Sequence, residues 1–386
     1  MSLDLNKLIK FAVENNASDV HLQALATPML RVSGQMRAIK DAEILTKEQT
    51  LEFITSIAPD NVKDNLEAEI VQGLDFSYAI PELCRFRCSA YRHLGQPGLV
   101  MRIIRREIPS IDSLHLPKVI HDIALSRRGL TLLTGTTGSG KSTTLAAMID
   151  LINSTYQTKI ITVEDPIEYV HASKKSLISQ LEVGLDTPSF AQAIRQSLRQ
   201  DPDVILVGEL RDVESLRIAL QAADTGHQVF STVHSSTTAQ TVERIIAMFP
   251  PAEHKLLLSQ LAGSTEAIIS QRLLATVKGD RRPAVEILRG TPVTEKFILE
   301  NRLSELADYV DQGDAGMQSF DQHILQLFQE DEISGTEAMR WSSHPEALAM
   351  AMRGIKTTNM RGGAETVPES TSDTDAGQYD LEEKNK

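Results

Sequence analysis

An eight-residue motif near the middle of the chain has the spacing of a phosphate-binding loop. Its sequence, GTTGSGKS, fits G-x-x-x-x-G-K-[ST]. In such loops the glycines let backbone N–H groups surround phosphate oxygens, the lysine reaches the β- and γ-phosphates, and the final hydroxyl binds Mg²⁺. We therefore expect ATP and Mg²⁺ to bind at this loop, with its lysine exposed to solvent. The predicted binding residues are Gly135, Thr136, Thr137, Gly138, Ser139, Gly140, Lys141, Ser142 and Thr143.

The segments on both sides of the motif are those that a phosphate loop requires. An apolar, strand-like run from Leu130 to Leu133 precedes it. After it, Leu145, Met148, Ile149 and Ile152 recur at i, i+3, i+4 and i+7, so they share one face of a predicted helix. The alternative, an ordinary turn rich in Gly and Ser, needs neither flanking element.

Two carboxylates end apolar runs and are candidates for catalysis. Glu209 ends VILVGE, where a P-loop ATPase places an acid that contacts Mg²⁺ through water. Glu164, in VEDPIE, could accept a proton from the attacking water. Asp165 and Glu168 compete with Glu164 for that role. Because Pro166 favours a turn, these acids could also be ordinary solvated turn residues.

Two histidines flank another apolar run. His227 precedes it and His234 ends it, with Thr232 between them. Histidine can donate to a phosphate or pair with a carboxylate, so the two could sense the nucleotide or a neighbouring subunit. Each alone would more often be a structural histidine.

Three arginines of the N-terminal part are candidates for phosphate recognition. Arg85 and Arg87 alternate with apolar residues, which places both on one face of a strand, and Arg102 interrupts the apolar run VMRII. Planar guanidinium groups bind phosphate in a bidentate way. The alternative is that all three are solvated surface arginines.

Beyond the loop, strand-like and helix-like segments alternate. This pattern predicts an α/β fold with a mostly parallel sheet and helices on both faces. Such folds bind ligands at the carboxyl ends of their strands, where Glu164, Glu209 and His234 fall. The predicted segments are the strands Lys159–Val163, Asp203–Val207 and Gln228–Val233 and the helices Ser189–Arg199 and Val213–Ala223.

The N-terminal third has the pattern of a small α+β domain. Thr46 and Gln49 form a capping box before a predicted helix. A turn is expected from Gly95 to Gly98. A second turn is expected near Ser33 and Gly34, where the strand over Met29–Met36 ends. The other predicted elements are a helix over Leu5–Val13 and strands over Ser18–Leu22, Asp75–Ile80, Leu83–Tyr91 and Leu99–Ile104.

With 386 residues the chain is too long for one ordinary core, so we expect separate domains. From Pro250 to Arg353 the sequence indicates largely helical structure, with a loop at Lys278–Arg282. The predicted units are an N-terminal domain (1–106), a proline-containing linker (107–118), an ATPase domain (119–290), a helical C-terminal region (291–354) and a disordered acidic tail (355–386).

Composition narrows the possible partners. A net charge of −13 argues against sequence-independent binding of nucleic acid. The sequence contains neither a signal peptide nor a run of eighteen apolar residues, which predicts a cytoplasmic protein without direct membrane insertion.

Four boxes, taken together, resemble the type IV pilus retraction ATPases, the PilT/PilU branch of the secretion ATPase superfamily. GTTGSGKSTTLAAMID is similar to the family's Walker A box and ITVEDPIEYVH to its Asp box. LRQDPDVILVGELRD is similar to its Walker B box and TGHQVFSTVH to its His box. The resemblance runs from about residue 1 to residue 350.

The resemblance implies a PAS-like N-terminal domain, a RecA-like ATPase domain and a hexameric motor that removes pilin at the cytoplasmic face of the inner-membrane pilus base. An inner-membrane platform protein would be its partner. By the same resemblance, nucleotide and Mg²⁺ bind at the Walker A loop. The remaining site residues would be Glu164 as the water-activating acid, Glu209 as the Walker B acid, His227 and His234 as the His-box pair, and Arg85, Arg87 and Arg102 as nucleotide-facing arginines.

Two departures from the wider superfamily refine this reading. The assembly and secretion branches usually carry a four-cysteine zinc motif, and this sequence has no cysteine after Cys88, which favours the retraction branch. The segments PAVEIL and GMQSFDQ are more similar to PilU than to PilT. An accessory subunit that couples to a paralogous retraction ATPase is therefore an alternative, and a nucleic-acid translocase is a third reading that the acidic charge disfavours.

Overall fold

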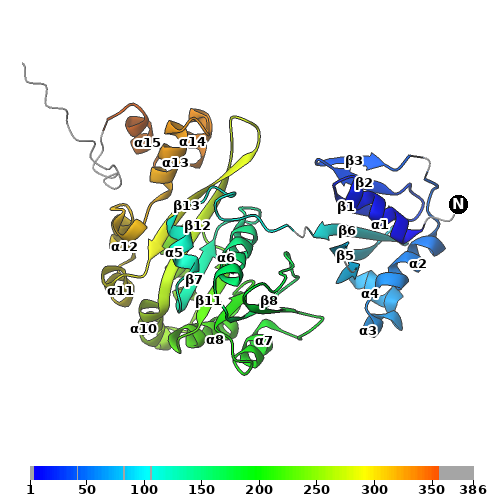
Figure 1. Cartoon of the computed structure of the whole chain (residues 1–386), viewed down its shortest axis with the longest axis horizontal. Coiled ribbons are helices and arrows are strands. Elements are labelled where there is room, and N and C mark those ends of the chain that lie inside the picture. Colours follow the sequence, from blue (N-terminus) through cyan, green and yellow to red (C-terminus); the bar gives the residue numbers. More distant parts are fainter. Residues whose placement is uncertain (1–3, 41, 81–82, 105–106, 356–386) are drawn as a thin grey trace, which may run out of the picture.

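The computed structural model describes residues 4–40, 42–80, 83–104 and 107–355. They form an N-terminal domain around a six-stranded antiparallel sheet and an ATPase domain around a seven-stranded, mostly parallel sheet (Figure 1). This is the predicted α/β fold class. Residues 356–386 of the predicted tail lie outside the described residues. In the described part of the chain, no helix is both long and apolar enough to cross a bilayer.

The strands of the N-terminal domain lie in the order β3-β2-β1-β6-β5-β4. The elements are α1 (Leu5–Glu14), β1 (Ala17–Gln23), β2 (Met29–Val32), β3 (Gln35–Ala38), α2 (Lys47–Ile57), α3 (Asp60–Lys63), α4 (Leu66–Gln72), β4 (Leu74–Ile80), β5 (Cys84–His93) and β6 (Gln96–Ile104). The predicted capping box is present, because Thr46 and Gln49 each bond the other's backbone N–H at the start of α2.

Of two predicted turns in this domain, one is present as predicted and the other is shorter. The turn predicted near Ser33 and Gly34 is present, and both residues have positive φ. The chain beyond it forms a second strand, so the predicted strand over Met29–Met36 is the hairpin β2–β3. The turn expected from Gly95 to Gly98 is shorter, since β6 already begins at Gln96. Gly98 therefore lies inside a strand, where a Cβ would come within 2.6 Å of the Tyr91 ring.

One face of the N-terminal sheet is covered and the other is polar. On β5, Cys84, Phe86 and Cys88 are buried in the core shared with α1, α2 and α4. Arg85 and Arg87 alternate with them and project from the opposite face, as predicted. The arginine-bearing face is therefore available to meet another part of the molecule.

The strands of the ATPase domain lie in the order β13-β12-β7-β11-β10-β8-β9, and only β13 is antiparallel to its neighbour. The elements are α5 (Val119–Ala124), β7 (Gly129–Thr134), α6 (Lys141–Thr155), β8 (Lys159–Glu164), β9 (Leu177–Glu182), α7 (Phe190–Ser197), β10 (Val204–Val207), α8 (Val213–Asp224), β11 (Gln228–Val233), α9 (Thr238–Met248), η1 (Pro251–Glu253), α10 (His254–Ser264), β12 (Thr265–Ala275) and β13 (Arg281–Arg289). The chain continues with α11 (Pro292–Leu299), α12 (Leu303–Val310), η2 (Asp314–Gly316), α13 (Phe320–Gln329), α14 (Gly335–Trp341) and α15 (Pro345–Met352).

Helices cover both faces of this sheet, so its central strands are apolar on both sides. On β7, Leu132 packs into the core formed with helices α7 to α12. Its neighbour Leu133 points the other way, into the core formed with α5 and α6. Because β7, β11, β10, β8 and β9 run parallel, their carboxyl ends lie at one edge of the sheet.

The prediction of largely helical structure from Pro250 to Arg353 is wrong in part. Residues 265–275 and 281–289 form the long hairpin β12–β13, and the predicted loop at Lys278–Arg282 overlaps its connection, residues 276–280, but extends into β13. The residues Ala267, Ile268 and Ile269 are all buried, because β12 lies between β7 and β13 with helices on either face. Such a continuous apolar run lacks the alternation by which strands are recognised, so it could not be told from a buried helix.

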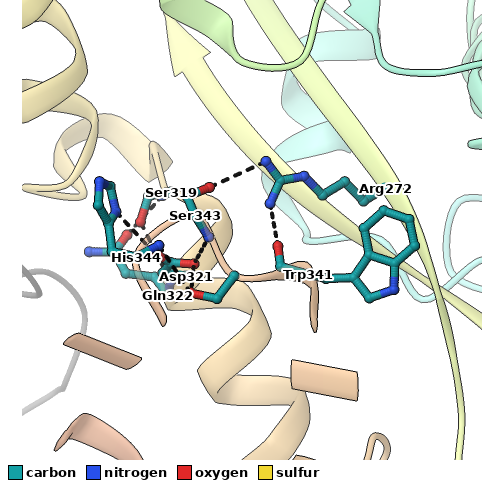
Figure 2. Close-up of polar contacts among 8 residues, drawn as sticks. Arg272, Ser319, Asp321, Gln322, Trp341, Ser343 and His344 are labelled. Carbon is teal, nitrogen blue, oxygen red and sulfur yellow. Dashed lines mark hydrogen bonds and ion pairs between the residues drawn. The ribbon is translucent and has the colours of Figure 1, made fainter. Parts of the chain in front are cut away.

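The C-terminal helices are attached to β12 by a polar cluster (Figure 2). The Arg272 guanidinium lies 3.8 Å from the centroid of the Phe320 ring and donates to the carbonyl of Trp341 and, at 3.2 Å, to the Ser343 hydroxyl. The buried Asp321 carboxylate accepts from the backbone N–H groups of Ser343 and His344. Helices α13 to α15 are thereby held against the hairpin.

Candidate functional site

A cavity of about 550 Å³ lies at the carboxyl ends of the parallel strands. It is bounded by the loop after β7 and by the ends of β8, β10 and β11, and one residue of the N-terminal domain, Arg87, also lines it. Predicted site residues that line it are Thr137, Gly138, Gly140, Lys141, Ser142, Thr143, Glu164, Glu209, His234 and Arg87. The fold thus brings together side chains that are up to 147 positions apart in the sequence, from Arg87 to His234.

The loop after β7 closes around its own lysine. Lys141 Nζ donates to the carbonyl oxygens of Gly135 and Thr136, at 2.9 Å each. Only 8% of Lys141 is exposed, so the expectation of an exposed lysine is wrong. Burial lowers the pKa of Lys141, while the carboxylates of Glu209 and Glu168 act in the opposite direction. These carboxylates favour the charged ammonium group that a phosphate needs.

Glu164 is a half-buried carboxylate at the end of β8. Its Oε1 accepts from the hydroxyl of Thr162 at 2.7 Å and from the amide of Gln180 at 3.2 Å. Its Oε2 accepts from the Glu168 backbone N–H at 3.4 Å. Burial raises the pKa of Glu164 more than these bonds lower it. A raised pKa makes this carboxylate a better proton acceptor.

Two other acids compete with Glu164 for the role of proton acceptor, and both lie near it. Asp165 and Glu168 both line the cavity. Asp165 is more exposed than Glu164, with 45% of its side chain accessible. The following Tyr169 was not singled out from the sequence. Its hydroxyl lies 2.9 Å from the hydroxyl of Thr143, which ties this turn to the start of α6.

Glu209 lies between His234 and Arg211 after β10. Its Oε1 lies 3.1 Å from His234 Nε2, and its Oε2 accepts from Arg211 Nε at 2.8 Å. His234 follows β11, the neighbour of β10, so adjacent strand ends produce this pair. Arg211 was missed from the sequence, although it follows Glu209 by two positions and lines the same cavity.

The two predicted His-box residues are far apart. His227 precedes β11 and His234 follows it, so seven steps of extended chain, about 23 Å, separate them. His227 lines a second cavity of about 200 Å³ at the opposite end of the sheet, and its Nδ1 lies 2.9 Å from the Ala222 carbonyl oxygen. Within one chain, His227 is not part of the nucleotide cavity.

The three predicted arginines take different places. Arg87 lines the nucleotide cavity. Arg85 makes an ion pair of 2.7 Å with Glu182, which ends β9 in the other domain. Arg102 pairs within its own domain, with Asp19 at 2.9 Å, and 68% of its side chain is exposed. Only Arg87 is positioned to face a nucleotide, while Arg85 joins the two domains.

The cavity also fits Mg²⁺. Magnesium takes oxygen ligands and usually keeps several waters, with one or two protein groups and the phosphates completing the shell. The Ser142 hydroxyl and the Glu209 carboxylate both line the cavity and provide such oxygens. The described residues contain no cluster of three or more acidic, His or Cys side chains that would hold a metal alone.

A phosphate loop at the first strand of a mostly parallel sheet, with acids at the ends of the neighbouring strands, defines a P-loop ATPase of the RecA-like class. The chain belongs to the type II/IV secretion system protein family, whose model matches residues 1–308. Within it, the chain is a member of the PilT/PilU group of type IV pilus ATPases.

Relatives support this placement over nearly the whole chain. The type IV pilus retraction ATPase PilT of Pseudomonas aeruginosa is 40% identical over 345 residues, which cover 89% of this chain and 99% of PilT. PilU of the same organism is 34% identical over 355 residues, which cover 91% and 92%. A crystal structure of the pilus retraction motor PilT with bound ADP has a TM-score of 0.84 at 38% identity and covers 90% of this chain and 99% of that one.

Proposed function

We propose that this protein is an ATP-hydrolysing motor that drives type IV pilus retraction. The observation that carries this proposal is the cavity, in which the phosphate loop faces Glu164, Glu209 and an arginine of the N-terminal domain. Similarity to PilT over almost the full length supports pilus retraction as the work that hydrolysis drives.

In this proposal the side chains of the cavity have separate roles. Lys141 releases the loop carbonyls and binds the β- and γ-phosphates. Ser142 and Glu209 hold Mg²⁺, which neutralises phosphate charge when bound. Glu164 orients water and accepts its proton as the oxygen attacks the γ-phosphorus and the bond to ADP breaks. Arg87 stabilises the charge on the transferred phosphoryl group.

The assembly we propose is a homo-hexamer at the cytoplasmic face of the inner-membrane pilus base, in contact with a platform protein. This assignment rests on membership of the PilT/PilU group. A subunit contact would also give a place to His227, which lies away from the nucleotide of its own chain. Binding of nucleic acid is not part of the proposal, given the net charge of −13.

A second candidate is an accessory subunit whose ring couples to a paralogous retraction ATPase and whose own hydrolysis is dispensable. The similarity to PilU favours it, although the identity to PilT is higher. Retraction in Lys141→Ala cells, compared with wild-type and deletion cells, separates the two candidates. A motor requires Lys141→Ala to behave like the deletion, whereas normal retraction with Lys141→Ala and none in the deletion would show an accessory role.

A further inference from the structure

A buried glutamine outside the known motifs contacts the phosphate loop. Gln271 lies on β12, which runs parallel to β7 with Ser270 opposite Thr134, the last residue before the loop. Only 3% of Gln271 is exposed. The strand thus brings this side chain beside the loop from outside the nucleotide cavity.

Both ends of the Gln271 amide are used. Its Nε2 donates to the Ser139 carbonyl oxygen at 2.7 Å, and its Oε1 accepts from the Thr144 hydroxyl at 2.9 Å. A carbonyl oxygen can only accept, so the nitrogen of the amide must face Ser139. The side chain therefore bridges the crest of the loop and the first turn of α6.

Two loop glycines make room for this bridge. A Cβ on Gly140 would lie 2.7 Å from Gln271 Nε2, and one on Gly135 would lie 2.4 Å from the Gln271 carbonyl oxygen. Both glycines also have positive φ, +91° and +139°. The lack of a Cβ at both positions therefore allows β12 to approach the loop closely.

The bond to Ser139 has a consequence for the opposite side of the same peptide. In a trans peptide the C=O and the following N–H point in opposite directions. Holding the Ser139 carbonyl toward β12 turns the Gly140 N–H away from β12, and Gly140 lines the nucleotide cavity. A reversed peptide would instead direct a carbonyl oxygen at a phosphate.

We propose that Gln271 is a positioning residue that holds the Ser139–Gly140 peptide with its N–H toward the phosphates. The residue touches no nucleotide itself and acts through the loop. The proposal rests on the nucleotide site described above. It extends the ATP-binding machinery to a strand that carries none of the family motifs.

The test measures the dissociation constant of a fluorescent ATP analogue for wild type, Gln271→Leu and Gln271→Glu. Leucine is of similar size but makes neither bond, and an ionised glutamate would place an oxygen against the Ser139 carbonyl. We expect each variant to bind about tenfold more weakly at pH 8, which corresponds to about 1.4 kcal/mol. Unchanged affinity in both variants would overturn the proposal.

Gln228 provides a matched control. It is similarly buried, with 2% exposed. Its amide donates to the Ala124 carbonyl and to the Ser126 hydroxyl, but it lies at the opposite end of the sheet from the nucleotide cavity. Gln228→Leu is expected to lower the melting temperature as much as Gln271→Leu while leaving nucleotide affinity unchanged. Equal weakening in both would show a general loss of stability and contradict the positioning role.

The pH dependence of Gln271→Glu separates positioning from packing. A protonated glutamate can donate to the Ser139 carbonyl, so its affinity relative to wild type should recover as the pH falls from 8 to 5.5. The affinity of Gln271→Leu relative to wild type should stay constant. A constant ratio for both variants would contradict the proposal, whereas failure of wild type to bind the analogue would contradict the nucleotide site itself.

Discussion

The two sides of the nucleotide cavity are held in different ways. The phosphate loop is continuous with β7 and α6 and is bridged to β12, all within the ATPase domain. Arg87 comes from the N-terminal domain, and the ion pair between Arg85 and Glu182 joins that domain to the other. The loop side is therefore shaped before nucleotide binds, whereas the arginine side depends on how the N-terminal domain docks.

The largest effect is expected on the loop side. Lys141→Ala should reduce ATP hydrolysis to below about a tenth of wild type, because the phosphates lose their principal cation. The fold should persist, since the carbonyls of Gly135 and Thr136 can be hydrated from the cavity, and a thermal melt checks this. Lys174→Ala is the control, as it removes a lysine paired with Asp150 outside the cavity. Full hydrolysis by Lys141→Ala would contradict the site.

The next effect tests which acid activates water. Glu164→Gln should lower turnover by about 10²- to 10⁴-fold with little change in nucleotide affinity. Asp165→Asn and Glu168→Gln are the matched variants, and a larger loss in either would transfer the role. Because burial raises the pKa of Glu164, turnover should fall with decreasing pH at values above the ordinary glutamate pKa of 4.5. Turnover that is independent of pH down to that value would contradict this role.

A smaller effect is expected where the domains meet. Arg85→Ala leaves the Glu182 carboxylate, of which 5% is exposed, without its charged partner. Glu182 also accepts from the Ile167 N–H at 3.0 Å. The same carboxylate therefore holds both Arg85 and the turn that follows Glu164. We expect turnover at saturating ATP to fall several-fold. Arg102→Ala, which removes an exposed arginine of the same sheet face, should have less effect, and equal losses in both would argue against the docking role.

How much the sequence predicts also differs between these regions. The strand, glycine loop and helix were predicted because their periodicity is strong and local. The hairpin β12–β13 was not, because burial on both faces removes the alternation, and Gln271 was missed with it. His227 and His234 lie at opposite ends of β11, so the length of this strand already separates them. Their presence in one sequence motif had suggested that they act together. The partners of Arg85 and Arg102 depend on tertiary contacts that no spacing reveals.

Arg87 and the phosphate loop of one cavity belong to the same chain, and we expect this arrangement within one chain to hold in the assembled ring. It is tested by mixing two impaired proteins, Arg87→Ala and Lys141→Ala, and measuring ATP hydrolysis after subunit exchange, which co-purification through two different tags demonstrates. If Arg87 acts on its own chain's nucleotide, every site in a mixed ring lacks either the arginine or the lysine, so hydrolysis stays at the level of the separate proteins. Recovery of hydrolysis on mixing would show that a neighbouring subunit supplies the arginine and would rule out the arrangement within one chain.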